Sequence, residues 1–361
     1  MTESQAYIAF NLTDNVGFAT VEKLVARFGS AVAAWEEFPR KVSRTGGCVD
    51  YRQEEEIASK YGIKIVTPAD KGYPSILLES PGAPLALYVK GRVEAMSKPS
   101  VAIVGTRRAT SYGLDTARRL AGELSEAGWS IVSGLALGID AAAHRGALSA
   151  GGTTVGFLGS ALDRFYPDEN RELAREMVDA GGAVVSEFPF GRPADQITFP
   201  VRNHVVASIS KGVVAVECPA KSGTLITAAI AAEIGRTVMA VPGRVLDRYS
   251  AGCLKLIRDG ALLVRNSDDV IEALSGFAGL MRQAAKPAPV EPNDGGDALP
   301  AYGPEEAMIM LHVDDVGVPV DEIVEKTKLP VEKVNALVMA LRVKGFVKFL
   351  PGNRVALPTE V

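Results

Sequence analysis

Residues 100–275 repeat one pattern: a short apolar run, a turn rich in Gly, Ser, Pro or Arg, and a segment with helical spacing of its apolar residues. The apolar runs are Val101–Val104, Trp129–Val132, Thr154–Leu158, Ala183–Ser186, Val213–Val216, Val238–Val241 and Ala261–Val264. This alternation is typical of βαβ units, and continuous apolar runs indicate strands covered on both faces. The sequence therefore predicts an α/β fold with a doubly wound parallel sheet, whose ligands bind beyond the carboxyl ends of the strands.

The remainder of the 361-residue chain separates into smaller parts. Residues 1–62 predict a helical module, interrupted at Asp14–Gly17 and Phe28–Ser30, that resembles a helix-hairpin-helix or sterile-alpha-motif unit. Both DNA contact and plain packing remain open for this module. Residues 63–275 add a Pro-rich extension with a strand at Leu85–Val89 to the alternating segment, and this extension is too apolar to stay solvated.

A linker is predicted at residues 276–302, because the Pro- and Gly-rich stretch there has no apolar periodicity. Residues 303–361 follow with helical patterns at Glu305–His312, Val320–Lys326 and Val331–Val343 and a hairpin at 346–357. This order resembles a winged helix. Nucleic-acid binding and partner binding both remain open, since the expected recognition helix, Val331–Val343, and its flank offer only Lys333, Arg342 and Lys344 against Glu332.

Composition excludes several classes of protein. No run of eighteen apolar residues and no leader-like segment is present, so we expect a cytoplasmic protein without membrane insertion. Three separated cysteines, Cys48, Cys218 and Cys253, exclude a disulfide framework and a Cys-based zinc site. The net charge is −4, but the acidic excess lies beyond residue 265, whereas residues 100–265 hold 18 Lys and Arg against 16 Asp and Glu. A basic groove in the central domain is therefore compatible with the charge.

The turn Gly105-Thr106-Arg107 is the first candidate phosphate site. Only the first glycine of a GxGxxG pattern is present, which argues against a dinucleotide, whereas an arginine beside a helix N-terminus suits phosphate. A second turn, Ser133-Gly134, permits close backbone approach. Asp140 and His144 follow at i, i+4 without a third ligand, so neither a metal site nor another cofactor is predicted.

Two further segments have the composition of a nucleic-acid contact. Phe199 opens a helix shortly before Arg202, Asn203 and His204, as expected where a base stacks and its phosphate is held, although a core position for Phe199 is the alternative. The turn Lys221-Ser222-Gly223-Thr224 offers a cation, hydroxyls and a glycine before another helix. It lacks the spacing of a Walker A motif, which disfavours ATP hydrolysis.

Together these blocks resemble the DNA-processing protein A (DprA, also called Smf) family from about residue 5 to 357. The similarity rests on Gly105-Thr106-Arg107, Ser133-Gly134 with Gly138-Ile139-Asp140 and His144, Tyr166-Pro167, Ser186-Glu187, Phe199-Pro200-x-Arg202-Asn203 and Lys221-Ser222-Gly223-Thr224. It implies an extended Rossmann-like domain that binds single-stranded DNA, a homodimer, protection of incoming DNA, and loading of RecA recombinase onto that DNA in natural transformation. His204 departs from the second arginine common in the family, and Asp168-Glu169 stand where some members have a basic residue.

The resemblance assigns no catalytic residue, and the site it implies is a row of phosphate contacts. Backbone and hydroxyl donors are expected from Gly105, Thr106, Ser133, Gly134, Ser222, Gly223 and Thr224, charges from Arg107, Arg202 and Lys221, and further contacts from Phe199, Asn203 and His204. The alternative is a Rossmann-like nucleotide phosphoribohydrolase, to whose Pro-Gly-Gly-x-Gly-Thr-x-x-Glu signature Pro219–Thr227 is similar. Thr227 stands at the position of that catalytic Glu, which leaves the general acid/base role without an occupant.

Overall fold

The structure is a computed structural model of the chain that describes residues 1–38, 49–80, 82–284, 308–314, 317–343, 346–350 and 354–357. The chain is divided into two compact units, Met1–Lys286 and Pro287–Val361. Within the described residues, no helix combines the length and apolar character that crossing a membrane requires.

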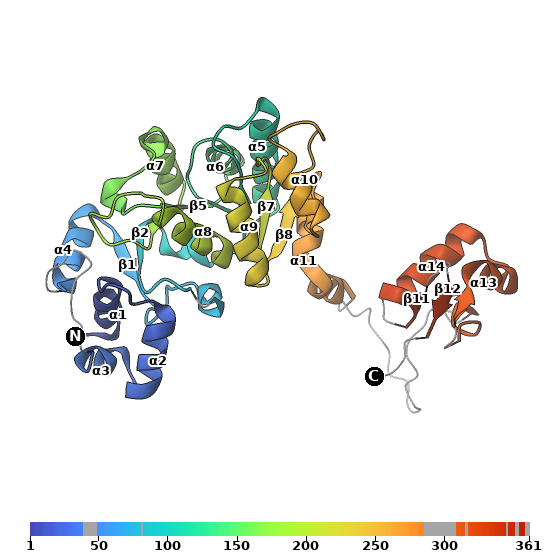
Figure 1. The fold of residues 1–361 in the computed structure, drawn as a ribbon, viewed down its shortest axis with the longest axis horizontal. Helices are drawn as coiled ribbons and strands as arrows, with labels where there is room; N and C mark the ends of the chain where they lie inside the picture. The colour runs from blue at the N-terminus through green and yellow to red at the C-terminus, as the bar shows by residue number, and fades with distance from the viewer. Residues whose placement is uncertain are drawn as a thin grey trace. The chain divides into compact units, whose positions relative to one another are not determined.

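A nine-stranded sheet forms the centre of the first unit, in the order β1-β2-β6-β5-β4-β3-β7-β8-β9 (Figure 1). Its strands are β1 Lys64–Val66, β2 Leu87–Gly91, β3 Ser100–Val104, β4 Ser130–Ser133, β5 Thr154–Phe157, β6 Ala183–Ser186, β7 Gly212–Ala215, β8 Thr237–Ala240 and β9 Leu262–Leu263. Neighbours from β6 through β9 pair in parallel, whereas β1 and β2 join the β6 edge antiparallel. The predicted doubly wound sheet is confirmed, and the Pro-rich extension contributes two strands to it.

Helices cover both faces of this sheet (Figure 1). They are α5 Ser111–Glu126, α6 Ile139–Ser149, α7 Arg171–Asp179, α8 Thr198–Ile209, α9 Gly223–Glu233, α10 Ala251–Arg258 and α11 Ser267–Ala284. Alternate residues of β3 face opposite sides: Val101 and Ile103 pack with α5, α6 and α11, and Ala102 and Val104 pack with α8 and α9. Each strand residue is therefore buried by a helix, which explains the continuous apolar runs.

Helix α11 corrects the predicted start of the linker. It continues through residues 276–284, which were assigned to the linker. The sequence there, Gly276-Phe-Ala-Gly-Leu-Met-Arg-Gln-Ala284, contains mostly residues that tolerate a helix and no proline. The turn signals begin only with Lys286-Pro287, and residues 285–307 lie outside the described part of the chain.

Four helices, α1 Glu3–Asn11, α2 Phe18–Phe28, α3 Ala31–Glu36 and α4 Tyr51–Tyr61, form the N-terminal part of the same unit. Their core contains an edge-to-face contact of Phe10 with Trp35, with ring centroids 5.1 Å apart. The predicted interruptions fall between α1 and α2 and at Gly29, which ends α2 in a left-handed conformation. The side chain of Asn11 donates to the carbonyl of Glu187, so these helices are anchored beyond the end of β6.

The second unit contains α13 Val320–Thr327 and α14 Val331–Val343 with a three-stranded sheet in the order β10-β12-β11. The strands are β10 Val318–Pro319, β11 Lys348–Leu350 and β12 Arg354–Ala356. Ile323, Val338 and Val355 meet in its core. Two helices followed by a hairpin agree with the winged-helix prediction. Of the predicted helix Glu305–His312, residues 308–310 are helical and 311–312 form a turn, whereas residues 305–307 and the cation Lys344 lie outside the described residues.

Candidate nucleic-acid interface

The centre of the sheet contains a topological switch point. Strand β3 lies between β4 and β7, and the connections from β4 and β7 run outward in opposite directions. Turns after these strands therefore diverge and leave a crevice at the carboxyl ends. A cleft of about 400 Å³ occupies this place, lined by residues of three turns and of α8: Gly105, Thr106, Arg107, Arg108, Gly134, Ala136, Asp140, Arg202, Asn203, Lys221, Ser222, Gly223 and Thr224 among others.

Helix α9 presents an open N-terminus to this cleft. Its first residues, Gly223 and Thr224, line the cleft, and their N–H groups have no hydrogen-bond partner in the part of the chain that the structure describes. The cap residue Ser222 makes no side-chain bond to them. Unpaired N–H groups and the positive end of the helix dipole favour an anion at this position.

Helix α5 differs, because its N-terminus is already occupied by the Glu217 carboxylate. Glu217 follows β7 and accepts hydrogen bonds from the Thr110 amide (2.9 Å) and the Thr110 hydroxyl (2.5 Å). Its carbonyl also accepts from the Thr106 amide at 2.7 Å. The expectation that this helix end would receive an external anion is therefore wrong. Glu217 instead holds the turn that carries Arg107 in place.

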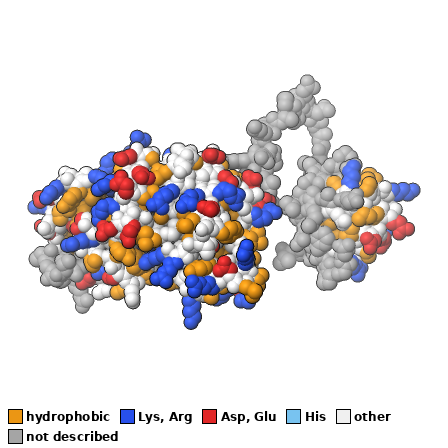
Figure 2. All heavy atoms as spheres, turned by 90° about the horizontal axis from the view of Figure 1, so that it is seen from above, with side chains coloured by type: hydrophobic (Ala, Val, Ile, Leu, Met, Phe, Trp, Pro, Cys, Tyr) orange, Lys and Arg blue, Asp and Glu red, His pale blue; other side chains and the backbone are white. Residues whose placement is uncertain are grey.

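Three exposed cations border the cleft without an ion pair among the described residues: Arg107, Arg108 and Lys221. The Arg107 guanidinium lies over the Phe199 ring, 4.7 Å from its centroid. Phe199 is half-buried and packs against Gly159, so its ring serves both as core and as a platform for Arg107. On the face of the first unit seen in Figure 2, Lys and Arg side chains are interspersed with Asp, Glu and hydrophobic side chains.

Arg202 is buried, contrary to the expectation that it would be accessible. Its Nη1 donates to the carbonyls of Gly134 and Phe157, and its Nε donates to the Asn203 side chain at 3.0 Å. Burial lowers the pKa of Arg202 to about 10. Its Nη2 makes no hydrogen bond to a described residue, so this nitrogen is the one left for a ligand in the cleft. Arg202 thereby links the ends of β4 and β5 to the site.

Asp140 balances this buried arginine. One carboxylate oxygen accepts from the amides of Gly134 and Ala136, at 3.1 and 3.4 Å. Burial raises the pKa of Asp140, and the Arg202 charge opposes that rise. Gly134 leaves the space for both side chains, since a Cβ there would lie 2.4 Å from Arg202 Nη1 and 2.8 Å from Asp140. The space beside this glycine is therefore taken by side chains of the chain itself.

Two predicted contacts do not reach the cleft. The Ser133 hydroxyl is buried and donates to the Ile103 carbonyl at 2.6 Å, so it joins β4 to β3 instead of facing a phosphate. His204 points away from Asn203 on the helix and lies 3.1 Å from the Ser80 hydroxyl. One residue along a helix turns the side chain by about 100°. Burial lowers the pKa of His204, which further removes it from phosphate binding.

Asp140 and His144 do not form a shared metal site. The Nδ1 of His144 lies 2.7 Å from the Thr154 hydroxyl, which itself donates to Ile131, so Nδ1 carries the proton. In the described ranges, no group of three or more His, Cys, Asp or Glu side chains is arranged to hold a metal ion.

Glu217 is the residue of this site that the sequence analysis missed. The available signal was a carboxylate placed directly after the apolar run Val213–Val216, at the same strand end that attracted attention to Arg107. The same turn brings the buried thiols of Cys218 and Cys253 within 3.6 Å, although 35 positions separate them in the sequence.

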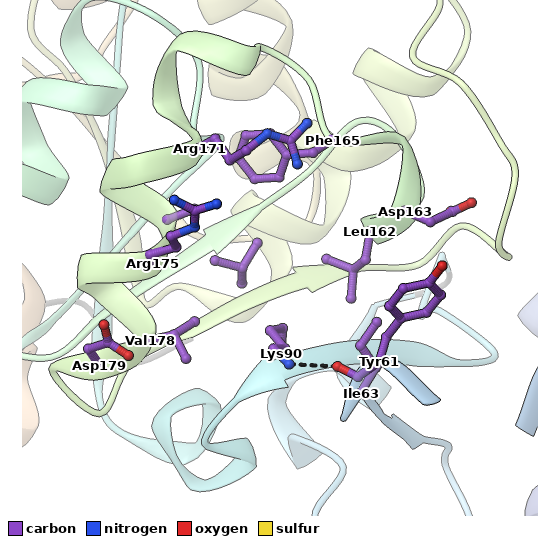
Figure 3. Close-up of a pocket in the computed structure, with 12 residues that line it drawn as sticks. Tyr61, Ile63, Lys90, Leu162, Asp163, Phe165, Arg171, Arg175, Val178 and Asp179 are labelled. Atoms are coloured by element: carbon purple, nitrogen blue, oxygen red, sulfur yellow. Dashed lines mark hydrogen bonds between the residues drawn. The ribbon is translucent and has the colours of Figure 1, made fainter. Parts of the chain in front are cut away.

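A larger cavity, of about 660 Å³, lies between the β1–β2 extension and α7 (Figure 3). Its cations already have partners: Lys90 donates to the Tyr61 carbonyl at 2.6 Å, and Arg171 pairs with Asp168 at 2.5 Å. Arg175 likewise pairs with a neighbouring glutamate on α7. Paired, solvent-exposed charges attract an additional anion weakly, so the switch-point cleft is the better candidate despite its smaller volume.

Comparison with known proteins agrees with this geometry. Residues 64–275 match the family model of DNA recombination-mediator protein A, and residues 284–353 match the DprA winged helix domain. The chain belongs to the DNA recombination-mediator protein A family. The resemblance to DprA/Smf proteins and the winged-helix prediction are thus confirmed.

Relatives of this family extend over most of the chain. Protein Smf of Escherichia coli is 36% identical over 291 residues, covering 80% of this chain and 76% of the relative. Protein Smf of Synechocystis is 30% identical, covering 98% of both chains. Among solved structures, DNA processing protein A of Streptococcus pneumoniae has a TM-score of 0.60 at 30% identity, covering 75% of this chain and 97% of that one. A structure from Helicobacter pylori, described by its single-stranded DNA binding mode, has a TM-score of 0.53 at 28% identity and covers 61% and 97%.

Proposed function

We propose that the switch-point cleft binds the backbone of single-stranded DNA. The observation that carries this proposal is the open N-terminus of α9 beside the ion-pair-free cations Arg107 and Lys221. Phosphates would receive the N–H groups of Gly223 and Thr224 and the charges of the two cations. The name of the Helicobacter pylori relative, which refers to single-stranded DNA binding, supports the choice of ligand.

The rest of the predicted site divides by its geometry. Asn203, Thr106 and Ser222 line the cleft and remain candidate polar contacts, and the Nη2 of Arg202 is a further one. Gly105 and Gly134 also line the cleft, and the absence of a side chain at each makes room for neighbouring residues of the chain: Ile139 at Gly105, and Arg202 with Asp140 at Gly134. Because these groups read phosphates and sugars, we expect little preference for sequence.

Salt titration of an Arg107→Ala variant tests this proposal. Single-strand affinity should fall about ten-fold, as for loss of one charge-assisted hydrogen bond, and the slope of log affinity against log salt should fall by about 0.7. Arg118→Ala is the matched control, because Arg118 is an exposed arginine of α5 that pairs with Asp115. Equal binding of single and double strands, or equal behaviour of both variants, would reject the proposal.

Hydrolysis of nucleotides is the alternative function. Among the cleft-lining residues Asp140 is the one carboxylate, and two backbone amides already engage it. Thr227 donates to the Gly223 carbonyl at 3.3 Å and offers no acid or base. Incubation with nucleoside monophosphates tests this function directly: base release that is lost in Asp140→Asn would favour the enzyme.

On the basis of the family resemblance, we further propose that the protein delivers the bound strand to RecA recombinase during transformation and that it acts as a homodimer. One feature supports self-association: the edge strand β9 exposes Leu262 and Leu263, 48% and 45% accessible. Exposed apolar edge strands are prone to pairing with another chain. Light scattering of the wild type and of Leu263→Lys would measure the molecular mass and so test the dimer. RecA filament formation on single-stranded DNA already bound by this protein would test delivery.

A further inference from the structure

The loop that follows β8, Pro242–Tyr249, has no role in the site described above. Its tip is unusually apolar for a solvated loop: Val245 is 82% and Leu246 99% accessible. Two arginines, Arg244 and Arg248, flank this tip and are also exposed. Two apolar side chains kept in water beside two cations indicate a contact surface better than they indicate a structural role.

Hydrogen bonds tie both ends of the loop to elements that adjoin the switch-point cleft. Strand β8 pairs in parallel with β7, so the loop leaves the same edge of the sheet as the turn that carries Lys221. The Tyr112 hydroxyl, in the first turn of α5, donates to the Pro242 carbonyl at 3.3 Å. At the other end, the Gly252 amide donates to the Cys218 carbonyl at 2.8 Å. A ligand that passes Lys221 therefore meets this loop next.

The charges of the loop resemble those of the cleft and differ from those around it. Neither Arg244 nor Arg248 has a carboxylate partner among the described residues, whereas Arg265, beyond the neighbouring strand, pairs with Asp269 at 2.8 Å. The loop's single carboxylate, Asp247, accepts from the Tyr249 amide at 2.9 Å. Two cations against one engaged carboxylate leave the loop positive.

An aromatic ring accompanies these cations. The Arg248 guanidinium lies 4.7 Å from the Tyr249 ring centroid, and its Nη2 donates to the Tyr249 hydroxyl at 2.7 Å. Arg107 and Phe199 make the same type of stacked pair in the cleft. Free cations interleaved with aromatic and apolar side chains are the composition by which single-stranded nucleic acids are held without sequence readout.

We propose that the Pro242–Tyr249 loop is a second contact for single-stranded DNA, reached by a strand that leaves the switch-point cleft past Lys221. Arg244 and Arg248 bind phosphates, and Val245, Leu246 and Tyr249 contact unstacked bases. This inference rests on the proposed function of the cleft. It fixes the direction in which the strand crosses the sheet, from β3 and β7 toward β8.

Binding of oligo-dT of increasing length to the full chain tests the loop. The double variant Arg244→Ala/Arg248→Ala should bind the shortest oligonucleotides, which fill only the cleft, as tightly as wild type. For long oligonucleotides it should lose on the order of ten-fold in affinity, with a salt slope reduced by about 1.4 for two phosphates. Arg258→Ala, at the opposite end of α10, is the matched control for an exposed arginine.

The result separates this inference from the function on which it rests. If Arg107→Ala weakens binding but the double variant binds every length like wild type, the loop proposal fails and the cleft proposal stands. A loss that is equal at all lengths also overturns it, because the loop would then act on the cleft. Leu246→Ser should weaken the binding of long oligonucleotides and leave the binding of short ones unchanged. If this variant instead changes the molecular mass measured by light scattering and leaves DNA affinity unchanged, the tip is a protein contact and the loop proposal fails.

Discussion

Glu217→Gln should weaken both the fold and the binding of single-stranded DNA, although it removes a negative charge near a DNA site. The Glu217 carboxylate is 2% accessible and accepts two hydrogen bonds from Thr110 at the start of α5. Glutamine has nearly the same shape but lacks the charge. One of its terminal atoms must face Thr110 as a donor, so the substitution tests charge and hydrogen bonding without creating a cavity.

The magnitude follows from these contacts. Replacing two charge-assisted hydrogen bonds by neutral ones and removing an anion from a helix N-terminus costs about 2–3 kcal/mol of unfolding free energy. Solvent screening does not reduce this value, because the carboxylate is buried. Urea denaturation measures it, and the adjoining turn should then hold Arg107 less firmly. We expect a loss of single-strand affinity no larger than that of Arg107→Ala.

A thermodynamic cycle distinguishes this explanation from simple charge repulsion. If Glu217 acts through Arg107, the Glu217→Gln/Arg107→Ala double variant binds single strands like Arg107→Ala alone. If the carboxylate merely repels phosphate, Glu217→Gln binds more tightly than wild type at low salt. Tighter binding together with unchanged stability would refute the argument that Glu217 positions the turn.

Three further outcomes follow from buried groups near the site. Burial lowers the pKa of His144 to about 3 from an ordinary 6.5, so the neutral ring stabilises the fold above pH 6.5 and this contribution is lost as the pH falls toward 3. At pH 5 the loss is about 2 kcal/mol, and denaturation of His144→Gln should lack this pH dependence. Arg202→Lys removes the planar fork that bridges the Gly134 and Phe157 carbonyls, and thermal unfolding should show a loss of about 2–4 kcal/mol. His204→Asn should leave single-strand affinity unchanged on both sides of the ordinary histidine pKa, since His204 faces Ser80; a pH-dependent change in fluorescence anisotropy would contradict this placement.

The fold was predictable from the sequence because its signals are local and repeated. Each run such as Val101–Val104 is apolar throughout, since helices cover both faces of its strand, and each turn marks the carboxyl edge. The rules of doubly wound sheets allow several strand orders, so the position of the switch point at β3 and β7 could not be predicted from the sequence. The structure selects one.

The site was predictable as a set of turns, but the roles within it were not. Arg107 and Lys221 border the cleft, as their positions after strands suggest. Ser133 and Arg202 also follow strands or begin a helix near this edge, yet the Ser133 hydroxyl and the Arg202 Nη1 donate to backbone carbonyls of the chain itself. Such contacts join residues 30 to 68 positions apart, and no local pattern reports them.

His204 and Glu217 show two opposite errors of a prediction based on sequence neighbours: one residue was included in the site and the other was overlooked. His204 was assigned to the site because it adjoins Asn203, but a helix sends adjacent side chains in different directions. Glu217 was overlooked because its partner Thr110 is 107 positions away. In both cases the decisive fact is the direction of a side chain in three dimensions.

The contact of Gly138 with the Arg107 turn affects how this protein tolerates mutation. Gly138 has a φ of +79°, and a Cβ on it would lie 2.4 Å from the Thr106 carbonyl oxygen. Any side chain at this position therefore forces the turn after β3 and the turn after β4 apart. In a saturation library selected for DNA binding, Gly138 should be as intolerant as Arg107 itself, whereas the exposed Arg118, which lies outside the cleft, should vary freely. Intolerance to substitution in such a library would therefore mark the fit between neighbouring turns as well as the groups that contact DNA.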